Sequence, residues 1–309
     1  MLSILHLGRP TDGDSEYYSR WTKSFLRHQI IPGGSYNGKW EIGYNSAADE
    51  ITILVVDQYT PVDNDLLSKL PDLEYIVTPT TGLTHLKYDL DKYDYVKVIS
   101  LKGESEFLEN VTGVAEHVFY LIHKLIRESA RHPVTLYKKI IGIVGMGRIG
   151  TQVDRIAKAY GMQTICCDRK YEHNTLDKLK SLFRISDFVT LHVDENPSSI
   201  GMIDRDLIDR MSPYSYLINT SRGSIIDEPY LHNALLGKRI GGAGIDTSDL
   251  PPGAWDGLSN VFFTNHTAGR CLENRAKTDS FVIWKLQEAI RIRDLNLSRN
   301  RTPEPEKSL

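Results

Sequence analysis

The chain has 309 residues, a length that favours two domains over one. Hydrophobic residues make up 40% of the sequence and charged residues 25%, which is typical of a globular protein. The net charge of −3 gives no reason to expect a nucleic acid or an anionic membrane as partner. No apolar run approaches the roughly 18 residues that a membrane-spanning helix requires.

The amino terminus and the cysteines favour the cytoplasm. The segment MLSILHLGRP has too short an apolar run and no basic region before it, so we expect no signal peptide. The three cysteines form no disulfide framework, and Cys166 and Cys167 are neighbours on an expected strand, where they are typical of small core residues. Only the tail from Ser298 onward has the composition of a disordered segment.

The first part of the chain alternates between strand and helix patterns. Apolar runs and amphipathic spacing predict strands over 2–7, 51–56, 73–78 and 96–101, and helices over 17–28 and 64–70. The loop TPTTGL, residues 78–83, follows one of these strands, and ligands of open α/β sheets bind at such carboxyl ends. A plain glycine turn explains the same loop about equally well.

An amphipathic helix is expected over 114–129, where it would bridge the first part of the chain and the next. His117 and His123 on this helix are typical of packing or surface residues. Glu116 is explained by helix pairing. No chemistry is therefore assigned to these three side chains.

The stretch from 138 to 168 carries the clearest motif. A strand pattern at 140–144 runs directly into a Gly-x-Gly-x-x-Gly made by Gly145, Gly147 and Gly150, and a helical pattern follows. The first glycine makes the tight turn, the second lets the backbone approach a pyrophosphate, and the third lets helix and strand pack closely. A second strand pattern ends in Asp168, 18 positions after Gly150, where an acid accepts hydrogen bonds from ribose hydroxyls.

We interpret this stretch as a dinucleotide-binding unit, with an ordinary βαβ turn as the alternative. Asp168 would repel the additional phosphate of NADP and therefore favours NAD. Arg169 and Lys170 directly behind it act against that preference, because an Arg nearby can hold a 2′-phosphate.

The remainder of the chain repeats strand and helix with few interruptions. The patterns predict strands over 187–193, 216–219, 241–246 and 261–264, and helices over 205–211, 228–236 and 274–292. Because the last helix follows the second unit, it can return to the first. The first domain would then be discontinuous.

Two polar segments stand after strands of the second unit. Arg222, next to Gly223, can present its planar fork to a carboxylate, although a surface Arg is the more usual explanation. His266 can accept and donate a proton near neutral pH. A carboxylate beside His266 would raise its pKa, and Asp246 and Asp249 are the candidates.

Together these motifs resemble the D-isomer-specific 2-hydroxyacid dehydrogenase family. The matching segments are VAEH at 114–117, GIVGMGRIG at 142–150, DFVTLH at 187–192, the run from 202 to 228, GAGID at 242–246 and NVFFTNHTAG at 260–269. They follow the family's order and span the second domain. The first domain is compatible with the family's substrate domain but matches it more weakly.

The resemblance implies an α/β fold of two Rossmann-like or flavodoxin-like domains, with doubly wound parallel sheets and a cleft between them. It implies a discontinuous substrate domain of residues 1–108 plus 279–309 and an NAD-binding domain of residues 109–278. It further implies a homodimer that uses NAD, holds no metal and acts on a small 2-oxo or 2-hydroxy acid.

The resemblance also assigns roles to individual residues. Arg222 would bind the substrate carboxylate, and His266 would protonate the carbonyl oxygen as hydride arrives from NADH. The backbone amides of Thr80, Thr81 and Gly82 would receive the carboxylate. Arg148 and Ile149 would lie over the pyrophosphate, Asp168 on the adenosine ribose and Asp246 on the nicotinamide carboxamide. The other implied cofactor contacts are Gly145, Gly147, Gly150, His192, Val193, Thr220, Ser221, Ala268 and Gly269.

The chain departs from the family's pattern in three places. Pro251 stands where the family places the Glu that pairs with its catalytic His, and the loop between Asp246 and His266 is shortened to a spacing of 20. Asp249 is the candidate replacement as catalytic partner, with an exposed loop acid as the alternative. The family's arm before the fingerprint is reduced to residues 130–137, which leaves the dimer mode open. Asp194–Glu195 replaces an apolar pair that lines the nicotinamide side.

The sequence thus predicts a cytoplasmic NAD-dependent oxidoreductase that acts on CH–OH donors and interconverts a 2-oxo acid and a D-2-hydroxy acid. One alternative is a catalytically impaired NAD-sensing or scaffolding protein of the same fold. Another is a family enzyme acting on a different small anion, such as formate or phosphite. Retention of both Arg222 and His266 favours the enzyme, since a pure sensor needs neither.

Overall fold

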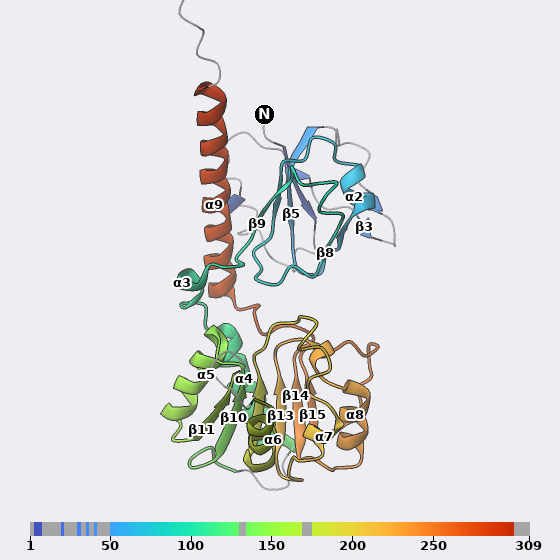
Figure 1. Cartoon of the computed structure of the whole chain (residues 1–309), viewed down its shortest axis with the longest axis vertical. Coiled ribbons are helices and arrows are strands. Elements are labelled where there is room, and N and C mark those ends of the chain that lie inside the picture. The colour runs from blue at the N-terminus through green and yellow to red at the C-terminus, as the bar shows by residue number, and fades with distance from the viewer. Residues whose placement is uncertain are drawn as a thin grey trace, which may run out of the picture. The chain divides into compact units, whose positions relative to one another are not determined.

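The computed structural model describes residues 3–7, 20–21, 30–31, 35–36, 40–41, 50–129, 134–168 and 175–299. The chain forms two compact units, Met1–Glu104 with Arg275–Leu309, and Ser105–Asn274. These boundaries lie four residues from the predicted ones, 108/109 and 278/279. Each unit is built around its own parallel sheet (Figure 1).

The sheet of the first unit has the strand order β2-β1-β5-β7-β9, and all its strands are parallel. Its strands are β1 (Ser3–Leu7), β2 (Ile30–Ile31), β5 (Ile51–Val56), β7 (Tyr75–Val77) and β9 (Lys97–Ile99). The order reverses between β1 and β5, which is the doubly wound pattern of flavodoxin-like sheets. The central strands β1 and β5 are almost entirely buried, as their continuous apolar runs predict.

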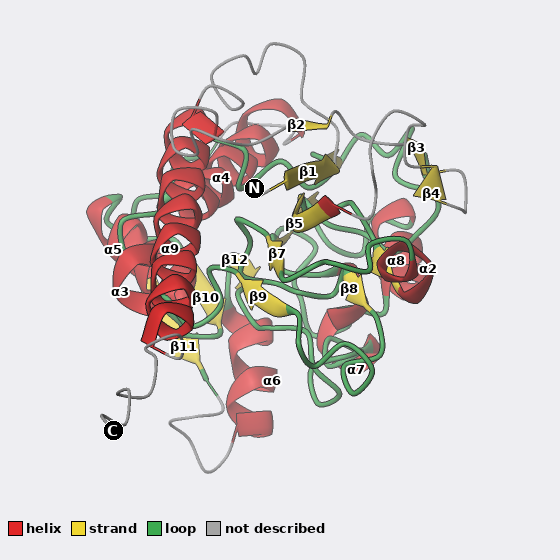
Figure 2. Cartoon of the chain, turned by 90° about the horizontal axis from the view of Figure 1, so that it is seen from above, coloured by secondary structure: helices red, strands yellow, loops and turns green. Residues whose placement is uncertain are grey.

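Short elements and one long helix complete this unit. They are the pairs β3 (Ser35–Tyr36) with β4 (Trp40–Glu41) and β6 (Val62–Asp63) with β8 (Leu86–Lys87), and the helices α2 (Asn64–Ser68) and α9 (Leu272–Arg299). Figure 2 shows α9 as the long helix beside β9. Ion pairs tie α9 to this unit, since Lys285 contacts Glu104 at 2.5 Å and Arg293 contacts Glu74 at 2.6 Å.

The second unit has a six-stranded parallel sheet of order β11-β10-β12-β13-β14-β15. Its strands are β10 (Ile140–Val144), β11 (Gln163–Cys167), β12 (Phe188–Leu191), β13 (Tyr216–Asn219), β14 (Gly242–Ile245) and β15 (Val261–Phe263). Its helices are α3 (Ser105–Leu108), α4 (Gly113–Lys124), α5 (Arg148–Ala159), α6 (Thr175–Ile185), α7 (Arg205–Ile208) and α8 (Glu228–Leu236). The strand order reverses between β10 and β12, and such switch points are where open α/β sheets bind ligands.

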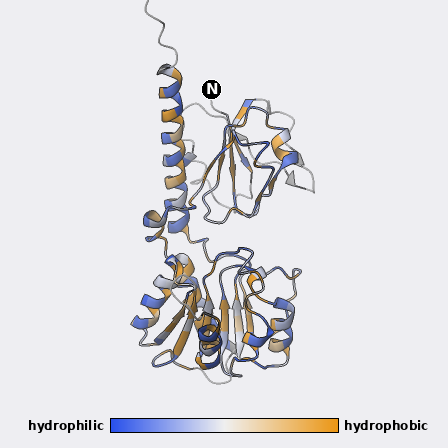
Figure 3. Ribbon diagram, in the orientation of Figure 1, coloured by the Kyte–Doolittle hydropathy of each residue, from blue (hydrophilic) through white to orange (hydrophobic). Residues whose placement is uncertain are grey.

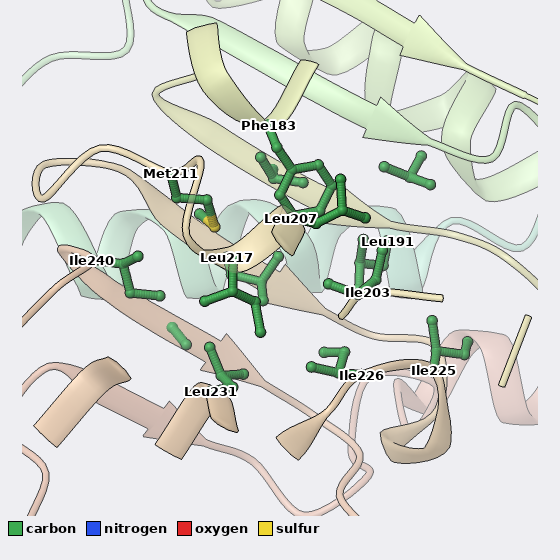
Figure 4. Packing of buried hydrophobic residues seen from close by; sticks show 14 of the residues in the cluster. Phe183, Leu191, Ile203, Leu207, Met211, Leu217, Ile225, Ile226, Leu231 and Ile240 are labelled. Atoms are coloured by element: carbon green, nitrogen blue, oxygen red, sulfur yellow. The ribbon is translucent and has the colours of Figure 1, made fainter. Parts of the chain in front are cut away.

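Alternate residues of the second sheet feed two separate cores. Ile141 and Ile143 pack with α4 and α5 on one face, while Leu191 and Leu217 pack with α6, α7 and α8 on the other. Figure 4 shows this second core, where Phe183 of α6 points toward the same space as Leu217. The hydrophobic colouring of the strands in Figure 3 follows from this burial on both faces. These buried layers hold the carboxyl ends of the strands in place.

The predicted fold class is confirmed, with three differences in detail. The helix α6 was not predicted, although Leu179, Leu182 and Phe183 have helical spacing and are buried. The predicted helix 114–129 is α-helical only to Lys124 and continues as a π-helix over Leu125–Ser129. Of the predicted helix 17–28 only 20–21 are described, and they are helical, while Ser298 still belongs to α9 and the tail beyond Arg299 lies outside the described residues.

Within the described part of the chain, no helix is long and apolar enough to cross a membrane. The same residues contain no group of three or more His, Cys, Asp or Glu side chains that could hold a metal ion.

Candidate active site

The glycine fingerprint forms the turn between β10 and α5. Gly145 adopts a φ of +92°, and a Cβ at this position would collide with the carbonyl oxygen of His192. A Cβ at Gly150 would collide with the carbonyl oxygen of Gly145, so α5 lies directly against the turn. The chain therefore requires glycine at both positions. Gly145 is needed for its positive φ and for the close contact, and Gly150 for the close contact alone.

Gly147 has a different environment, because a Cβ there would meet no atom within 4 Å. It is the N-cap of α5, and its helix has no side-chain cap from the described residues. The first amides of a helix have no acceptor within the helix, so the amides of Arg148 and Ile149 lie next to this open space. Ile149 packs its side chain against the buried cluster below. The arrangement suits an anion such as a pyrophosphate.

Asp168 follows β11 and lies beside the fingerprint turn. Its Oδ2 accepts a hydrogen bond from the Met146 amide at 2.6 Å. A carboxylate held here can also accept hydrogen bonds from ribose hydroxyls. Arg169 and Lys170, which bear on the choice between NAD and NADP, lie outside the described residues.

The guanidinium of Arg148 binds the backbone before α4. Its Nη1 donates to the carbonyl oxygen of Val111 at 3.0 Å and to that of Leu108 at 3.4 Å. Burial lowers the pKa of Arg148, and the charge of Asp194 opposes this shift. The Nη1 of Arg148 thus binds the backbone, while the amide of Arg148 belongs to the open first turn of α5.

Two buried polar atoms after β12 and β13 have no hydrogen-bond partner among the described residues: His192 Nδ1 and Thr220 Oγ1. The other ring nitrogen of His192 lies 2.9 Å from Thr190 Oγ1, and burial of the ring lowers its pKa to about 3, so the imidazole is neutral. Buried polar atoms are nearly always paired in native proteins. Both atoms therefore fit the polar groups of a bound dinucleotide.

The neighbouring predicted contacts lie at the same edge of the sheet. Val193 lies against Gly145, and Ser221 Oγ donates to the Leu191 carbonyl oxygen at 2.7 Å, which ties the end of β13 to that of β12. Together with the open space at Gly147 and the unpaired atoms of His192 and Thr220, these residues form a surface that fits a nicotinamide dinucleotide.

Arg222 follows β13 in an extended conformation, with φ −141° and ψ 150°. The fully buried Asn219 shapes this segment: its Nδ2 donates to the Arg222 carbonyl oxygen at 2.9 Å and its Oδ1 accepts from the Ser221 amide at 2.9 Å. Arg222 Nη1 donates to the Ser221 carbonyl oxygen at 2.7 Å. A guanidinium has five N–H donors, so this bond leaves the fork able to bind a carboxylate.

His266 lies after β15 in a strained turn. Asn265 and His266 have φ values of +49° and +58°, which residues other than glycine rarely adopt. Asp246, which is 1% exposed, holds the turn: its carboxylate accepts at 2.6 Å from Thr264 Oγ1, at 2.8 Å from the Thr267 amide and at 3.2 Å from the Ala268 amide. The Asp246 carbonyl oxygen accepts from the His266 amide at 2.5 Å. These bonds stabilise a backbone that local sequence would not adopt.

The ring of His266 is under the influence of several charges. Burial lowers its pKa, the charges of Arg222 and Arg270 lower it further, and the charge of Asp246 raises it. The charge of Arg222 therefore reaches the His266 ring. The structure thus places a guanidinium and an imidazole at the carboxyl edge of one sheet. Ala268 is buried next to this turn, and at Gly269 a Cβ would meet no atom within 4 Å.

Asp249 is exposed, and among the described residues its charge is not one of those that shift the pKa of His266. Its backbone amide instead donates to Glu228 Oε2 at 2.8 Å. Glu228, only 3% exposed, also accepts from the Leu250 amide and the Ser248 hydroxyl, and burial raises its pKa. Glu228, to which sequence reasoning assigned no role, thus anchors the shortened loop.

His117 is the second residue that sequence reasoning missed. The helix pattern predicts a packing or surface residue, whereas the structure places its Nε2 3.0 Å from Thr264 Oγ1 and 3.5 Å from Asp246 Oδ1. The contact with Thr264 joins residues 147 positions apart, so no local pattern shows it. The one signal in the sequence was the place of His117 in the VAEH segment before the fingerprint.

The predicted substrate loop belongs to the first unit and follows β7. Thr80 Oγ1 donates to the Gly82 carbonyl oxygen at 2.9 Å and lies 3.0 Å from the hydroxyl of the fully buried Thr78. The amides of Thr81 and Gly82 have no acceptor among the described residues. The hydroxyl of Thr80 thus ties the loop internally.

Comparisons with known proteins match this chain at several levels. The model of the NAD binding domain of D-isomer specific 2-hydroxyacid dehydrogenases matches residues 113–268. A hydroxypyruvate reductase of Thermotoga maritima is 28% identical over 262 residues, which cover 77% of this chain and 84% of the relative. A glyoxylate reductase of Korarchaeum cryptofilum is 29% identical over 274 residues, which cover 77% and 78%.

A solved structure supports the fold. The D-lactate dehydrogenase from Aquifex aeolicus, complexed with NAD and lactic acid, matches with a TM-score of 0.74 at 22% identity. The match covers 97% of this chain and 100% of that chain. At this identity the likeness concerns the fold alone.

Proposed function

The chain belongs to the D-isomer specific 2-hydroxyacid dehydrogenase family, and from this premise we propose that it reduces a small 2-oxo acid, with Arg222 as carboxylate-binding residue and His266 as acid/base. Family membership makes it an NAD-dependent oxidoreductase acting on CH–OH donors. The family, the enzyme class and the cofactor predicted from the sequence are confirmed.

The fork of Arg222 is suited to the negative end of the substrate. A guanidinium binds a carboxylate through two parallel N–H···O bonds, which fixes the orientation of the adjacent carbonyl as well as its position. Asn219 holds the backbone on both sides of the turn that carries Arg222. This support gives the side chain a fixed base, as an orienting residue requires.

His266 is suited to supply the proton. When bound, NADH supplies a hydride to the carbonyl carbon of the substrate. The developing negative charge on the carbonyl oxygen then needs a proton donor, and the imidazolium of His266 can provide it. In the reverse direction the neutral ring would accept the proton of the hydroxyl group.

The observation that carries the proposal is the placement of Arg222 after β13 and of His266 after β15, at the same carboxyl edge of the sheet. In the free protein the charge of Arg222 lowers the pKa of His266. A substrate carboxylate bound to Arg222 would offset that charge, and the pKa of His266 would rise. Binding of the anion would therefore favour the protonated ring that reduction of the carbonyl needs.

For the first unit we propose a role in substrate binding. The amides of Thr81 and Gly82 would donate to the substrate carboxylate, and Thr80 would hold their loop. The second unit would be the NAD-binding domain, as the match of its residues to the family model supports. The names of the two curated relatives suggest hydroxypyruvate and glyoxylate as first substrates to examine.

The test is oxidation of NADH by a panel of 2-oxo acids that differ in side chain, with NADPH run beside it. The wild-type protein should consume NADH with at least one acid, and the Arg222→Ala protein should lose that turnover while it still binds NADH. The His266→Ala protein should lose turnover far more than NADH affinity. Binding of NADH without turnover on any acid would overturn the proposal.

A second candidate function is an NAD-sensing or scaffolding protein of the same fold. The observation that favours it is the exposure of Asp249, whose charge is not among those that shift the pKa of His266. Tight NADH binding with no turnover in the same assay would support it.

We propose that the protein acts in the cytoplasm as a homodimer. No disulfide joins the three cysteines, all of which lie in the described residues, and this fits a reducing compartment. The dimer rests on the family resemblance, and light scattering of the purified protein at micromolar concentration would show a mass twice that of the chain.

A further inference from the structure

A chain of three side chains joins α4 to the loop that carries His266. Thr264 Oγ1 lies 2.6 Å from Asp246 Oδ1 and 3.0 Å from His117 Nε2. A carboxylate oxygen accepts, so the single hydroxyl proton of Thr264 is donated to Asp246. The Thr264 oxygen is then the acceptor for His117, whose Nε2 must carry a hydrogen. The geometry thereby selects the Nε2–H tautomer of a neutral His117.

The environment of His117 supports a fixed, neutral ring. Its side chain is 15% exposed, and its ring packs against that of Tyr120 with centroids 5.3 Å apart. Burial lowers the pKa of His117 and the charge of Asp246 raises it. The helix beneath it is a rigid base, because Val118 and Leu121 are fully buried in the core.

We propose that His117 is a positioning residue for the reaction, acting through Thr264 on Asp246. Asp246 is the group that holds the Thr267 and Ala268 amides and so keeps His266 in its left-handed turn. By holding the Thr264 hydroxyl, His117 fixes the orientation of the Asp246 carboxylate. The proposal rests on the assigned role of His266 as acid/base.

The chain of hydrogen bonds also gives the site a sensitivity to acid. The charged groups that face this cluster are Asp246 after β14, Arg222 after β13, and His266 and Arg270 after β15. A protonated His117 would pair directly with Asp246 Oδ1, which lies 3.5 Å from Nε2. It would compete there with Thr264 and Thr267 and loosen the turn. The change falls below pH 6.5, because the pKa of His117 is lowered from that value.

Three variants separate the hydrogen bond from the ring. His117→Phe keeps an aromatic ring and removes the donor, His117→Gln keeps a donor that cannot titrate, and His123→Gln is the control on the same helix. We expect His117→Phe to lower kcat for 2-oxo acid reduction about tenfold, the cost of one hydrogen bond, while the dissociation constant of NADH stays within about twofold. His117→Gln should keep kcat within about threefold at neutral pH and lose the fall in kcat on the acid side. His123→Gln should match the wild type.

A wild-type kcat and pH profile in His117→Phe would overturn the proposal. So would a His117→Gln protein as impaired as His117→Phe, because a retained hydrogen-bond donor would then fail to preserve kcat.

A measurement without turnover separates this proposal from the assigned reaction. Nitrogen-15 NMR of histidine-labelled protein, with the His117 signals assigned by their loss in His117→Gln, reports the tautomer directly. We expect Nε2–H in the wild type, and Thr264→Val should remove that preference. An Nδ1–H tautomer overturns the positioning role even in an active enzyme. Absence of 2-oxo acid reduction with the Nε2–H tautomer present would overturn the assigned reaction and leave the hydrogen-bond chain established.

Discussion

Two turns at the carboxyl edge of the second sheet both use backbone with positive φ, but different residues adopt it and different contacts hold it. The fingerprint turn reverses the chain after β10 with Gly145, whose φ of +92° costs a glycine little. The turn after β15 uses Asn265 and His266 at φ +49° and +58°, where L side chains are strained. The conformation of the first turn is encoded by its own glycine, and Asp168 adds one hydrogen bond to its Met146 amide. The second exists because Asp246, from another strand, holds its amides.

The difference shows how each turn serves its ligand. The fingerprint needs open space and backbone amides, which glycine supplies without side chains. The second turn must aim one imidazole, so it uses a side chain in a conformation that a distant carboxylate maintains. Changes at Asp246 should therefore act on chemistry, and changes in the fingerprint should act on cofactor binding.

The largest effect is expected for Asp246→Ala. The substitution leaves the Thr267 and Ala268 amides without their acceptor and releases His266 from its turn. Misplacement of a catalytic group by about 1 Å costs roughly a hundredfold, so kcat should fall by at least about that factor. The unpaired amide of the buried Ala268 should also lower the free energy of unfolding by about 1–3 kcal/mol.

Steady-state kinetics and chemical denaturation check both parts of this prediction. Asp246→Asn keeps the side-chain volume and one acceptor oxygen. Its kcat and its free energy of unfolding should therefore lie between those of the wild type and those of Asp246→Ala. An Asp246→Ala enzyme within threefold of the wild type would show that the turn holds itself.

The next largest effects are expected for two glycines of the fingerprint, whose substitution by alanine should change stability differently but lower NADH affinity in both cases. Gly150→Ala places a methyl group against the Gly145 carbonyl oxygen, so both stability and NADH affinity should fall, the latter by about tenfold or more. Gly147→Ala places its methyl group in open space at a φ of −71°, which alanine adopts readily. Its stability should be unchanged or higher while NADH affinity still falls. Calorimetry with and without NADH checks the pair; equal NADH affinity in Gly147→Ala and wild type would contradict the assigned cofactor position.

Burial of the His192 ring should make the stability of the protein depend on pH. Its pKa is about 3 in the folded protein and about 6.5 in the unfolded chain, so between these values the unfolded chain binds the extra proton. Stability should therefore be lost as the pH falls below 6.5, by about 2 kcal/mol at pH 5. Denaturation curves at both pH values check this. In His192→Gln this contribution to the pH dependence of stability should disappear. If the free energy of unfolding of that variant still falls as steeply with pH, groups other than His192 cause the fall.

The smallest effect is expected for Asp249→Asn, the matched counterpart of Asp246→Asn. Asp249 is exposed and is held through its backbone amide, which the substitution leaves in place. The kcat should stay within about threefold of the wild type, since a surface substitution of this kind changes little. A loss of a hundredfold with the fold intact would instead identify Asp249 as a carboxylate partner of His266, the role for which the sequence makes it a candidate.

Sequence patterns predicted the parts of this protein that short segments encode. The strands β10, β12 and β13 and the fingerprint follow from apolar runs and glycine spacing, and the structure places them within one or two residues of expectation. The helix α6 has a sequence signal of its own in the helical spacing of Leu179, Leu182 and Phe183. The π-helix after Lys124 has no such signal in the apolar spacing of the sequence.

The supporting residues of the site could not be predicted in this way. His117 and Glu228 act through contacts with Thr264 and with the loop at Asp249, far along the chain. Periodicity explains each of them fully as a helix residue, so only the folded structure shows their second role. The residues that the resemblance identified, Arg222 and His266, lie at the same edge of the sheet, and their charge coupling appears only in the folded protein.

The most direct test of the account is the pKa of His266, followed by NMR in the wild type and in Arg222→Ala. If Arg222 and His266 form one site, removal of the guanidinium should raise the pKa of His266, and by more than Arg270→Ala does. Addition of a non-reducible 2-oxo acid analogue should raise the pKa in the wild type and leave it unchanged in Arg222→Ala. A pKa of His266 that is the same in all of these samples would contradict the account.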